Sequence, residues 1–207
     1  MTYATHKAGG TLFALAGFEI LSKAGLLASE VEPWMALILM YPASSFGSTF
    51  PDLDHNWNSV KEHTPTNLVI HRILHLTHPK HRSWQTHCLI LTAIEITLLY
   101  LFLWLWNTYQ WFNTPQVTIS ILYLLITGFS LGVVSHLFLD MFTRAGIWIL
   151  PGIKTKLRLV PDNDKFSCAN ETYETIWRVV LYILSALLCI WILNPFGIQQ
   201  LIMNPST

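Results

Sequence analysis

The chain is poor in charge. Only 12% of its 207 residues are Asp, Glu, Lys or Arg, and the 12 basic residues equal the 12 acidic residues in number. A soluble domain carries roughly twice that share of charged residues, so an ordinary soluble domain is excluded and one compact membrane-embedded domain, residues 1–207, is favoured. No cluster of basic and aromatic side chains indicates a surface for nucleic acid, and no nucleic-acid partner is expected.

Cysteine is also scarce. The three cysteines, Cys88, Cys168 and Cys189, are odd in number and form no Cys-x-x-Cys motif, which argues against a disulfide framework and favours packing roles in a reducing compartment. A cleavable signal is not indicated either, because Glu19 and Lys23 interrupt the first apolar stretch. Side chains near the start of the chain are therefore expected in the mature protein.

Long apolar runs are abundant. A bilayer core about 30 Å thick is crossed by about 20 residues of helix. Three runs meet that length clearly, and two weaker ones precede them, the first with a Glu19 and Lys23 pair and the second broken by Pro42 and Gly47. The sequence predicts an all-α membrane protein with about four or five spans, at residues 8–28, 34–50, 88–106, 117–136 and 176–193.

The basic residues favour one orientation of these spans. The connection at 107–115 and the tail after residue 193 contain no Lys or Arg. Because cytoplasmic loops are enriched in Lys and Arg, the N-terminus and segments 51–86 and 143–174 are predicted to face the cytoplasm. This topology brings several histidines and carboxylates to one layer, the cytoplasmic membrane interface. They are His6, Asp52, Asp54, His81, His87, His136 and Asp140.

One helix face carries both an ionisable pair and small residues. His136 and Asp140 lie four residues apart, on the stripe that also holds Gly128 and Gly132. The glycines would let a neighbouring helix approach closely. The two ionisable side chains either bond each other at a helix end or serve a function, and function is the default for such a pair beside a membrane helix.

The other acidic side chains allow two interpretations each. Asp52 and Asp54 follow a proline in a turn, where short carboxylates either cap a helix or bind a metal. Glu95 lies two turns deeper than His87 on nearly the same face. For Glu95 a structural role is favoured over a catalytic one.

Two further groups are open to both a functional and a structural interpretation. His71, His75 and His78 have the spacing of metal ligands, but the same spacing gives the polar stripe of an amphipathic interfacial helix, which is favoured. Arg82 and Arg144 lie next to the expected ligands. Their guanidinium groups either bind phosphate oxygens or anchor the chain at the membrane surface.

Imidazoles and carboxylates together are the ligand set of Zn²⁺, Mn²⁺ or Fe. The number of such groups is too large for one closed structural site and favours two or more ions. Such a site activates water for hydrolysis of a phosphoester or ester. The sequence shows no serine nucleophile elbow and no nucleophilic cysteine motif, so no side-chain nucleophile is expected.

The chain resembles the LexA-regulated, membrane-bound metal-dependent hydrolases, a family also called YdjM-like. The matching pieces reach across about three quarters of the chain and comprise Thr5-His6 with Gly9-Gly10, Pro51-Asp52-Leu53-Asp54-His55, His81-Arg82 with Thr86-His87, and Gly132 to Asp140 with Thr143, Gly146 and Pro151. The resemblance implies a multi-span inner-membrane hydrolase with bound divalent metal, zinc being the expected ion. More remotely, the family is similar to zinc-dependent phospholipase C and P1-type nucleases, which implies cleavage of phosphoesters.

The residues and the resemblance together predict one site. The expected metal ligands are His6, Asp52, Asp54, His81, His87, His136 and Asp140. Five of these are also expected to be catalytic: Asp52, Asp54, His87, His136 and Asp140. Arg82 and Arg144 are expected to bind the phosphate of the substrate. The favoured substrate is a membrane lipid or polyprenyl phosphate, attacked by a metal-activated water.

Three rival functions remain open. A phosphatidic-acid type phosphatase shares the His-x-x-x-Asp spacing of His136 and Asp140, but its Lys/Arg-Pro and Ser-Gly-His elements are absent from the sequence. A divalent-metal transporter or sensor could use the same ligands, although a transporter places them near the bilayer midplane, where only Glu95 is predicted. Haem held by paired histidines would need histidines deep in two spans.

Overall fold

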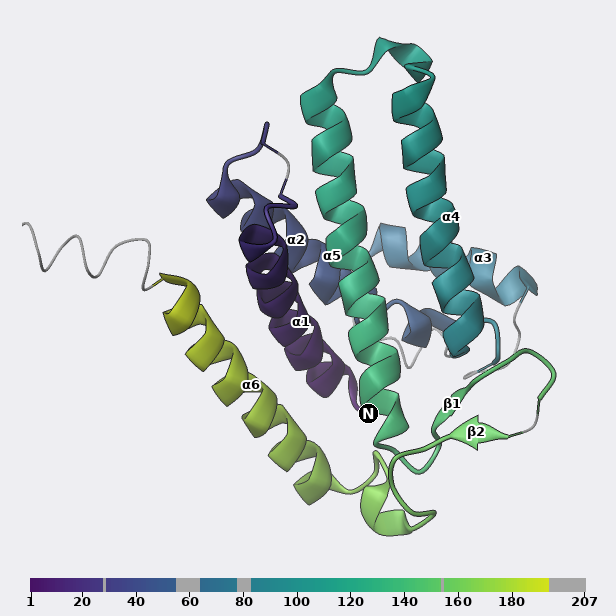
Figure 1. Cartoon of the computed structure of the whole chain (residues 1–207). Helices are drawn as coiled ribbons and strands as arrows, with labels where there is room; N and C mark the ends of the chain where they lie inside the picture. Colours follow the sequence, from purple (N-terminus) through teal and green to yellow (C-terminus); the bar gives the residue numbers. More distant parts are fainter. Residues whose placement is uncertain (28, 55–63, 78–82, 154, 194–207) are drawn as a thin grey trace, which may run out of the picture.

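The computed structural model describes residues 1–27, 29–54, 64–77, 83–153 and 155–193 (Figure 1). Most of them are helical, as predicted. The helices are α1 (Tyr3–Lys23), α2 (Pro33–Gly47), α3 (Pro65–Thr77), α4 (Leu89–Thr108), α5 (Gln116–Met141) and α6 (Glu171–Leu193). The short elements are the 3-10 turns η1 (Pro51–Asp54), η3 (Trp111–Asn113) and η4 (Asp164–Phe166), and the antiparallel strands β1 (Ile147–Trp148) and β2 (Lys156–Leu157).

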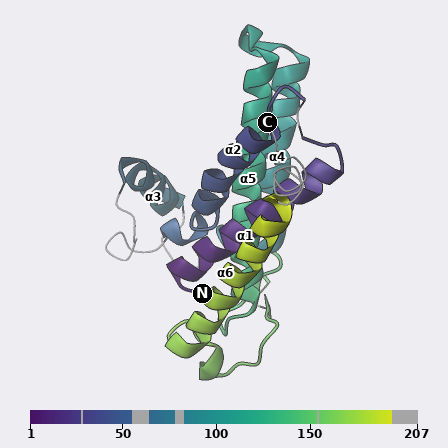
Figure 2. The same ribbon diagram turned by 90° about the vertical axis from the view of Figure 1, so that its left-hand side faces the viewer.

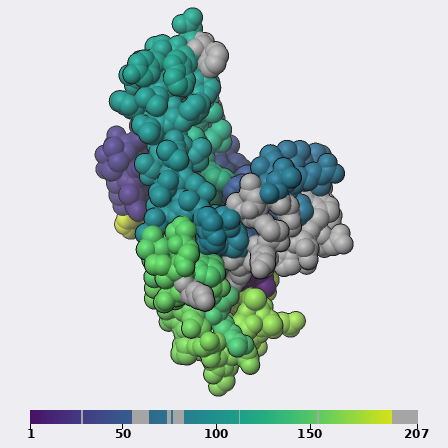
Figure 3. All heavy atoms as spheres, turned by 90° about the vertical axis from the view of Figure 1, so that its right-hand side faces the viewer, coloured from purple at the N-terminus to yellow at the C-terminus, as the bar shows by residue number. Residues whose placement is uncertain are grey.

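Helix α5 is the central element of the molecule. It forms a hairpin with α4 and packs against α1 and α2, and α1 in turn packs against α6 (Figures 1 and 2). A buried apolar cluster joins α1, α2, α5 and the end of α6, and includes Phe18, Met40, Leu124 and Ile192. Helix α3 contacts η1 and projects from the side of this body (Figure 3).

Three glycines let α2 pack directly on α5. A Cβ added to Gly132 would overlap the backbone carbonyl of Ser44, and one added to Gly47 would overlap the carbonyl of Phe129. A Cβ on Gly128 would likewise collide with the backbone of α2. The small residues on the His136 stripe were predicted to admit a neighbouring helix, and the structure confirms this and identifies the neighbour as α2.

Three of the described helices are long and apolar enough to cross a membrane, namely α4, α5 and α6. They correspond to the three clear apolar runs of the sequence. The two weaker runs, 8–28 and 34–50, form α1 and α2, and neither is among these three. The total of four or five spans therefore stays a prediction.

The contact between α2 and α5 can be tested with one methyl group. The change Gly132→Ala places a Cβ against backbone that cannot rotate away, and overpacking of this kind costs about 1–3 kcal/mol. We expect a clear fall in the melting temperature of the detergent-purified protein. The matched control is Gly17→Ala, where the nearest atoms all belong to the flexible side chain of Leu131. An equal loss in both variants would contradict the backbone contact.

Candidate metal centre

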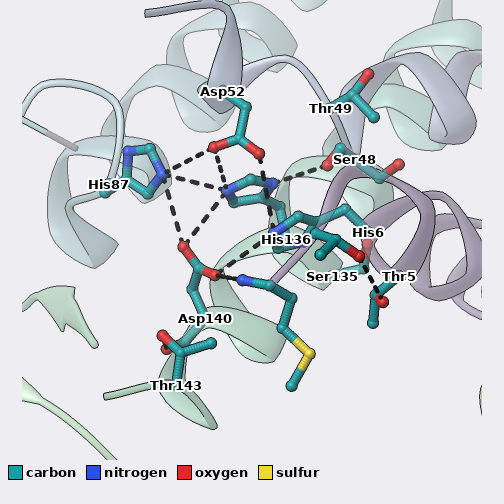
Figure 4. A network of polar contacts seen from close by, with 12 residues as sticks. Thr5, His6, Ser48, Thr49, Asp52, His87, Ser135, His136, Asp140 and Thr143 are labelled. Atoms are coloured by element: carbon teal, nitrogen blue, oxygen red, sulfur yellow. Dashed lines mark hydrogen bonds and ion pairs between the residues drawn. The ribbon is translucent and has the colours of Figure 1, made fainter. Parts of the chain in front are cut away.

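Four separate segments of the chain bring five ligand-type side chains together. His6 comes from the first turns of α1, Asp52 from η1, His87 from the residues before α4, and His136 and Asp140 from the end of α5 (Figure 4). Four of them are buried, with exposed fractions of at most 1%. Asp52 is 22% exposed and connects the cluster to its surroundings. These five side chains are called the His/Asp cluster below.

The hydrogen bonds behind two histidines fix their tautomers. Nδ1 of His136 lies 2.8 Å from the backbone carbonyl oxygen of Ser48. A carbonyl oxygen only accepts, so Nδ1 of His136 carries the proton and donates it. The other ring nitrogen, Nε2, is left with a lone pair.

A chain of two hydrogen bonds does the same for His87. The Thr86 hydroxyl lies 2.5 Å from Oδ2 of Asp54 and 2.8 Å from Nδ1 of His87. A hydroxyl has one proton, and an ionised carboxylate only accepts. Thr86 therefore donates to Asp54 and accepts from Nδ1 of His87, so in the neutral imidazole of His87 the lone pair lies on Nε2. Such outer partners orient a metal-binding imidazole.

These two lone pairs face each other. The Nε2 atoms of His87 and His136 are 3.2 Å apart. Oδ1 of Asp52 lies 3.7 and 3.8 Å from them, and Oδ2 of Asp140 lies 3.7 and 3.6 Å from them. Ligands bound tetrahedrally to zinc at 2.0–2.1 Å are roughly 3.3 Å apart. Four donor atoms at these spacings, with no proton on either nitrogen, fit a divalent cation.

His6 extends the cluster on the other side of both carboxylates. Its Nε2 lies 3.4 Å from Oδ1 of Asp140 and 4.0 Å from Oδ2 of Asp52. Each carboxylate thus directs one oxygen toward the His87 and His136 pair and its other oxygen toward His6. Carboxylates placed in this way can bridge two ions. Two triads can be formed from these residues, His6 with His136 and Asp140, and Asp52 with His87 and His136.

The surroundings of His6 favour a cationic partner. Its ring stacks on that of His136, with centroids 3.7 Å apart. Both ring nitrogens of His6 are buried, and neither has a hydrogen-bond partner among the described residues. An unsatisfied buried polar atom is costly, and an ion beside Nε2 would remove that cost for this nitrogen. The amine of Met1 already places one positive charge here, 2.6 Å from Oδ1 of Asp140.

The pKa values of Asp52 and His6 are shifted toward the forms that bind a metal. Burial alone would raise the pKa of the Asp52 carboxyl, but when the imidazoles of His136, His87 and His6 carry positive charge they outweigh burial and hold that pKa below its usual range. Burial lowers the pKa of His6, and the amine of Met1 lowers it further, against the opposing effect of the carboxylates. An ionised Asp52 and a neutral His6 are the forms that bind a metal.

The remaining predicted site residues lie elsewhere. Asp54 sits behind His87, with Oδ2 3.8 Å from Nδ1, so the geometry favours a positioning role for Asp54 over ligation. Arg144 is half-exposed, and its guanidinium bonds Asp162 at 2.8 Å and also bonds Asp164. It lines a surface cavity of about 600 Å³ with other basic residues, so the structure does not bring it into the cluster. His81 and Arg82 fall outside the described residues.

Three supporting groups were missed by sequence reasoning. The Ser48 carbonyl belongs to the backbone and leaves no signal in the sequence. Thr86 could have been found as a hydroxyl directly before a ligand. Glu174, an acidic residue in the first turn of α6, reads as an ordinary helix start. In the structure its buried carboxylate accepts hydrogen bonds from the Thr5 hydroxyl at 2.7 Å and the Thr2 hydroxyl at 2.9 Å, which ties α6 to the turn of α1 that carries His6.

Loss of His136 tests the cluster as a metal site. Both triads use this imidazole, so we expect His136→Ala to lose bound divalent metal, measured by mass spectrometry of the purified protein. The control is His71→Ala, which removes a histidine of α3 outside the cluster. Metal content unchanged in a correctly folded His136→Ala variant would rule out the ligand assignment.

The outer hydrogen bonds can be tested separately from the ligands. The change Thr86→Val keeps the side-chain shape but removes the hydroxyl between Asp54 and His87. We expect metal affinity to fall by about 10–100-fold, measured by competition with a chelating dye. The matched control is Thr97→Val, since the Thr97 hydroxyl donates to the carbonyl of Ala93 in its own helix. Equal affinities in the two variants would show that Thr86 does not orient His87.

Comparison with known proteins identifies the family. The model of the YdjM inner membrane protein family matches residues 1–196, a range that includes the whole His/Asp cluster. The comparison with curated proteins gives no match, and neither does the comparison with solved structures. Together with the three apolar helices, the family match indicates a protein of the inner membrane. The chain belongs to the YdjM inner membrane protein family.

Proposed function

We propose that this protein is a membrane-bound metal-dependent hydrolase that cleaves a phosphoester of a lipid or polyprenyl phosphate. The observation that carries the proposal is the pair of Nε2 atoms on His87 and His136, 3.2 Å apart and flanked by the carboxylates of Asp52 and Asp140. A structural metal site closes all its ligand positions, whereas a catalytic one leaves a position open. The partial exposure of Asp52 supports the second kind.

The chemistry follows from the ligand set. A divalent ion such as zinc, held there, supplies a Lewis acid for a phosphoryl oxygen and lowers the pKa of water. Asp52, His87 and His136 would hold one ion and leave its fourth position open for water or substrate, and His6 with Asp140 would hold another in place of the Met1 amine. Because the other four side chains are buried, a substrate would reach the cluster from the side of Asp52. In the overall reaction water adds to phosphorus, the ester bond from phosphorus to oxygen breaks, and the leaving oxygen takes a proton.

The position of the cluster supports a lipid substrate. His87 lies two residues before α4 begins, and Asp140 lies one residue before α5 ends. If α4 and α5 span the bilayer, the cluster lies at the level of the membrane surface, where lipid phosphates are found. The distribution of Lys and Arg favours the cytoplasmic surface. Phosphate binding by Arg82 and Arg144 stays a prediction, and for Arg144 it requires exchange of its carboxylate partners.

A divalent-metal transporter or sensor is the alternative. It would use the same ligands, but a transporter binds its ion near the midplane of the spans. The cluster instead lies at the ends of α4 and α5. This placement favours hydrolysis.

The proposal is tested by an assay of phosphate release. Metal-loaded protein in detergent is expected to release phosphate or headgroup from a panel that includes phosphatidic acid and a polyprenyl phosphate, and to stop when a chelator removes the metal. Asp140→Asn is expected to lower the rate by at least about 100-fold, because residues that merely support metal ligands already contribute 10–100-fold. The control Glu32→Gln changes an exposed acid before α2.

A negative result would discriminate between the two functions. Bound metal in the purified protein, with no release from any phosphoester of the panel, would contradict the hydrolase proposal. Uptake of the metal into sealed proteoliposomes would then support the transporter.

A further inference from the structure

A cavity of about 430 Å³ lies between α4, α5 and η1. We infer that it holds one hydrocarbon chain of the phosphate-bearing lipid that the His/Asp cluster cleaves, an inference that rests on the proposed function. Its apolar lining comes from three parts of the chain and comprises Phe50, Ile96, Leu98, Leu99, Phe129 and Val133. The volume falls in the range of cavities that bind small molecules, about 300–1,000 Å³.

The cavity is lined by chain neighbours of the His/Asp cluster. Pro51 lines the cavity and is followed in the chain by Asp52, and Thr86 lines it and is followed by His87. Val133 lines it from α5, one helical turn before His136. Three of the lining residues are thus one residue or one turn from an expected metal ligand. A lipid with its phosphate at the cluster would have its chain at the entrance of this cavity.

The polarity of the cavity wall changes in the direction that a lipid requires. Helix α4 begins at Leu89, next to His87, and runs away from the cluster. Its lining residues are polar at first, Thr92 and Glu95, and then apolar at Ile96, Leu98 and Leu99. The polar groups suit the ester or hydroxyl groups near a lipid headgroup, and the apolar ones suit the chain beyond them.

If α4 and α5 span the bilayer, the far side of the cavity faces its hydrocarbon core. Both of its long walls, α4 and α5, are long and apolar enough to span a membrane. Leu98 and Leu99 line the cavity and are also exposed on the surface of α4. A hydrocarbon chain can therefore pass from the lipid phase into the cavity without contact with water, which avoids the cost of hydrating an apolar surface.

A second apolar cavity offers a control. It has a volume of about 650 Å³ and is formed by α1, α2 and α6, with Ile38 in its wall. None of the residues that line it lies within one turn of an expected ligand. A lipid chain seated there would have no reason to present its phosphate to the cluster.

The test fills one cavity at a time. Ile96→Trp narrows the cavity beside the cluster, and Ile38→Trp is the matched change in the second cavity. Hydrolysis is measured with phosphatidic acid, a polyprenyl phosphate and the chain-free ester p-nitrophenyl phosphate. We expect Ile96→Trp to raise KM for the long-chain substrates by about 10-fold and to leave kcat/KM for p-nitrophenyl phosphate within about 2-fold of the parent protein. Ile38→Trp is expected to change neither. A larger effect on the polyprenyl phosphate than on phosphatidic acid, or the reverse, identifies which chain the cavity fits.

A binding measurement separates this inference from the hydrolase proposal. A phosphatidic acid with a photoreactive group on its acyl chain is expected to label residues 92–99 and 129–133, and the label is expected to disappear in Ile96→Trp. This readout holds even if no phosphoester of the panel is cleaved. Leu99→Trp, at the exposed edge of the cavity, replaces Ile96→Trp if the latter does not fold. Labelling of other residues would overturn the inference. So would labelling of residues 92–99 and 129–133 that stays unchanged in the folded variant, Ile96→Trp or its replacement Leu99→Trp.

Discussion

The arrangement of the molecule depends on two imidazole nitrogens that face each other. Hydrogen bonds on the far side of each ring leave Nε2 of both His87 and His136 with a lone pair, and these atoms are 3.2 Å apart. Positive charge between them relieves the repulsion, and the surrounding carboxylates attract it further. The packing of α2 on α5 serves this arrangement, because it brings the Ser48 carbonyl to His136. The hydrogen bond from the Thr5 hydroxyl to Glu174 likewise holds the turn of α1 that carries His6.

Much of the fold could be predicted from apolar length and small-residue spacing. The three clear apolar runs are α4, α5 and α6, and the Gly128 and Gly132 stripe is the contact surface for α2. The helix ends were harder to predict. An apolar run marks the part of a helix that suits lipid, whereas backbone hydrogen bonding continues past it. Helix α5 therefore extends to Met141, past the predicted span, and contains Asp140, as expected from its place on one helix face with His136.

The sequence predicts that the five side chains of the His/Asp cluster come together, but it does not predict which of their atoms face one another. Alternation of the predicted spans placed the segments with His6, Asp52, His87, His136 and Asp140 in one layer, and the structure brings these five together. The different roles of Asp52 and Asp54 depend on how η1 turns each carboxylate. A spacing of two residues in a turn does not specify that direction. The Ser48 carbonyl could not be found at all, because a backbone acceptor becomes a partner only through tertiary packing.

The central claim is that a cation belongs between the two Nε2 atoms. Anomalous diffraction at the zinc absorption edge, from crystals of the zinc-loaded protein, measures this directly. The account predicts a peak about 2.0–2.1 Å from Nε2 of both His87 and His136, with a carboxylate oxygen of Asp52 as the third ligand. A peak located only at other residues, or no peak between the two Nε2 atoms in zinc-loaded crystals, would contradict it.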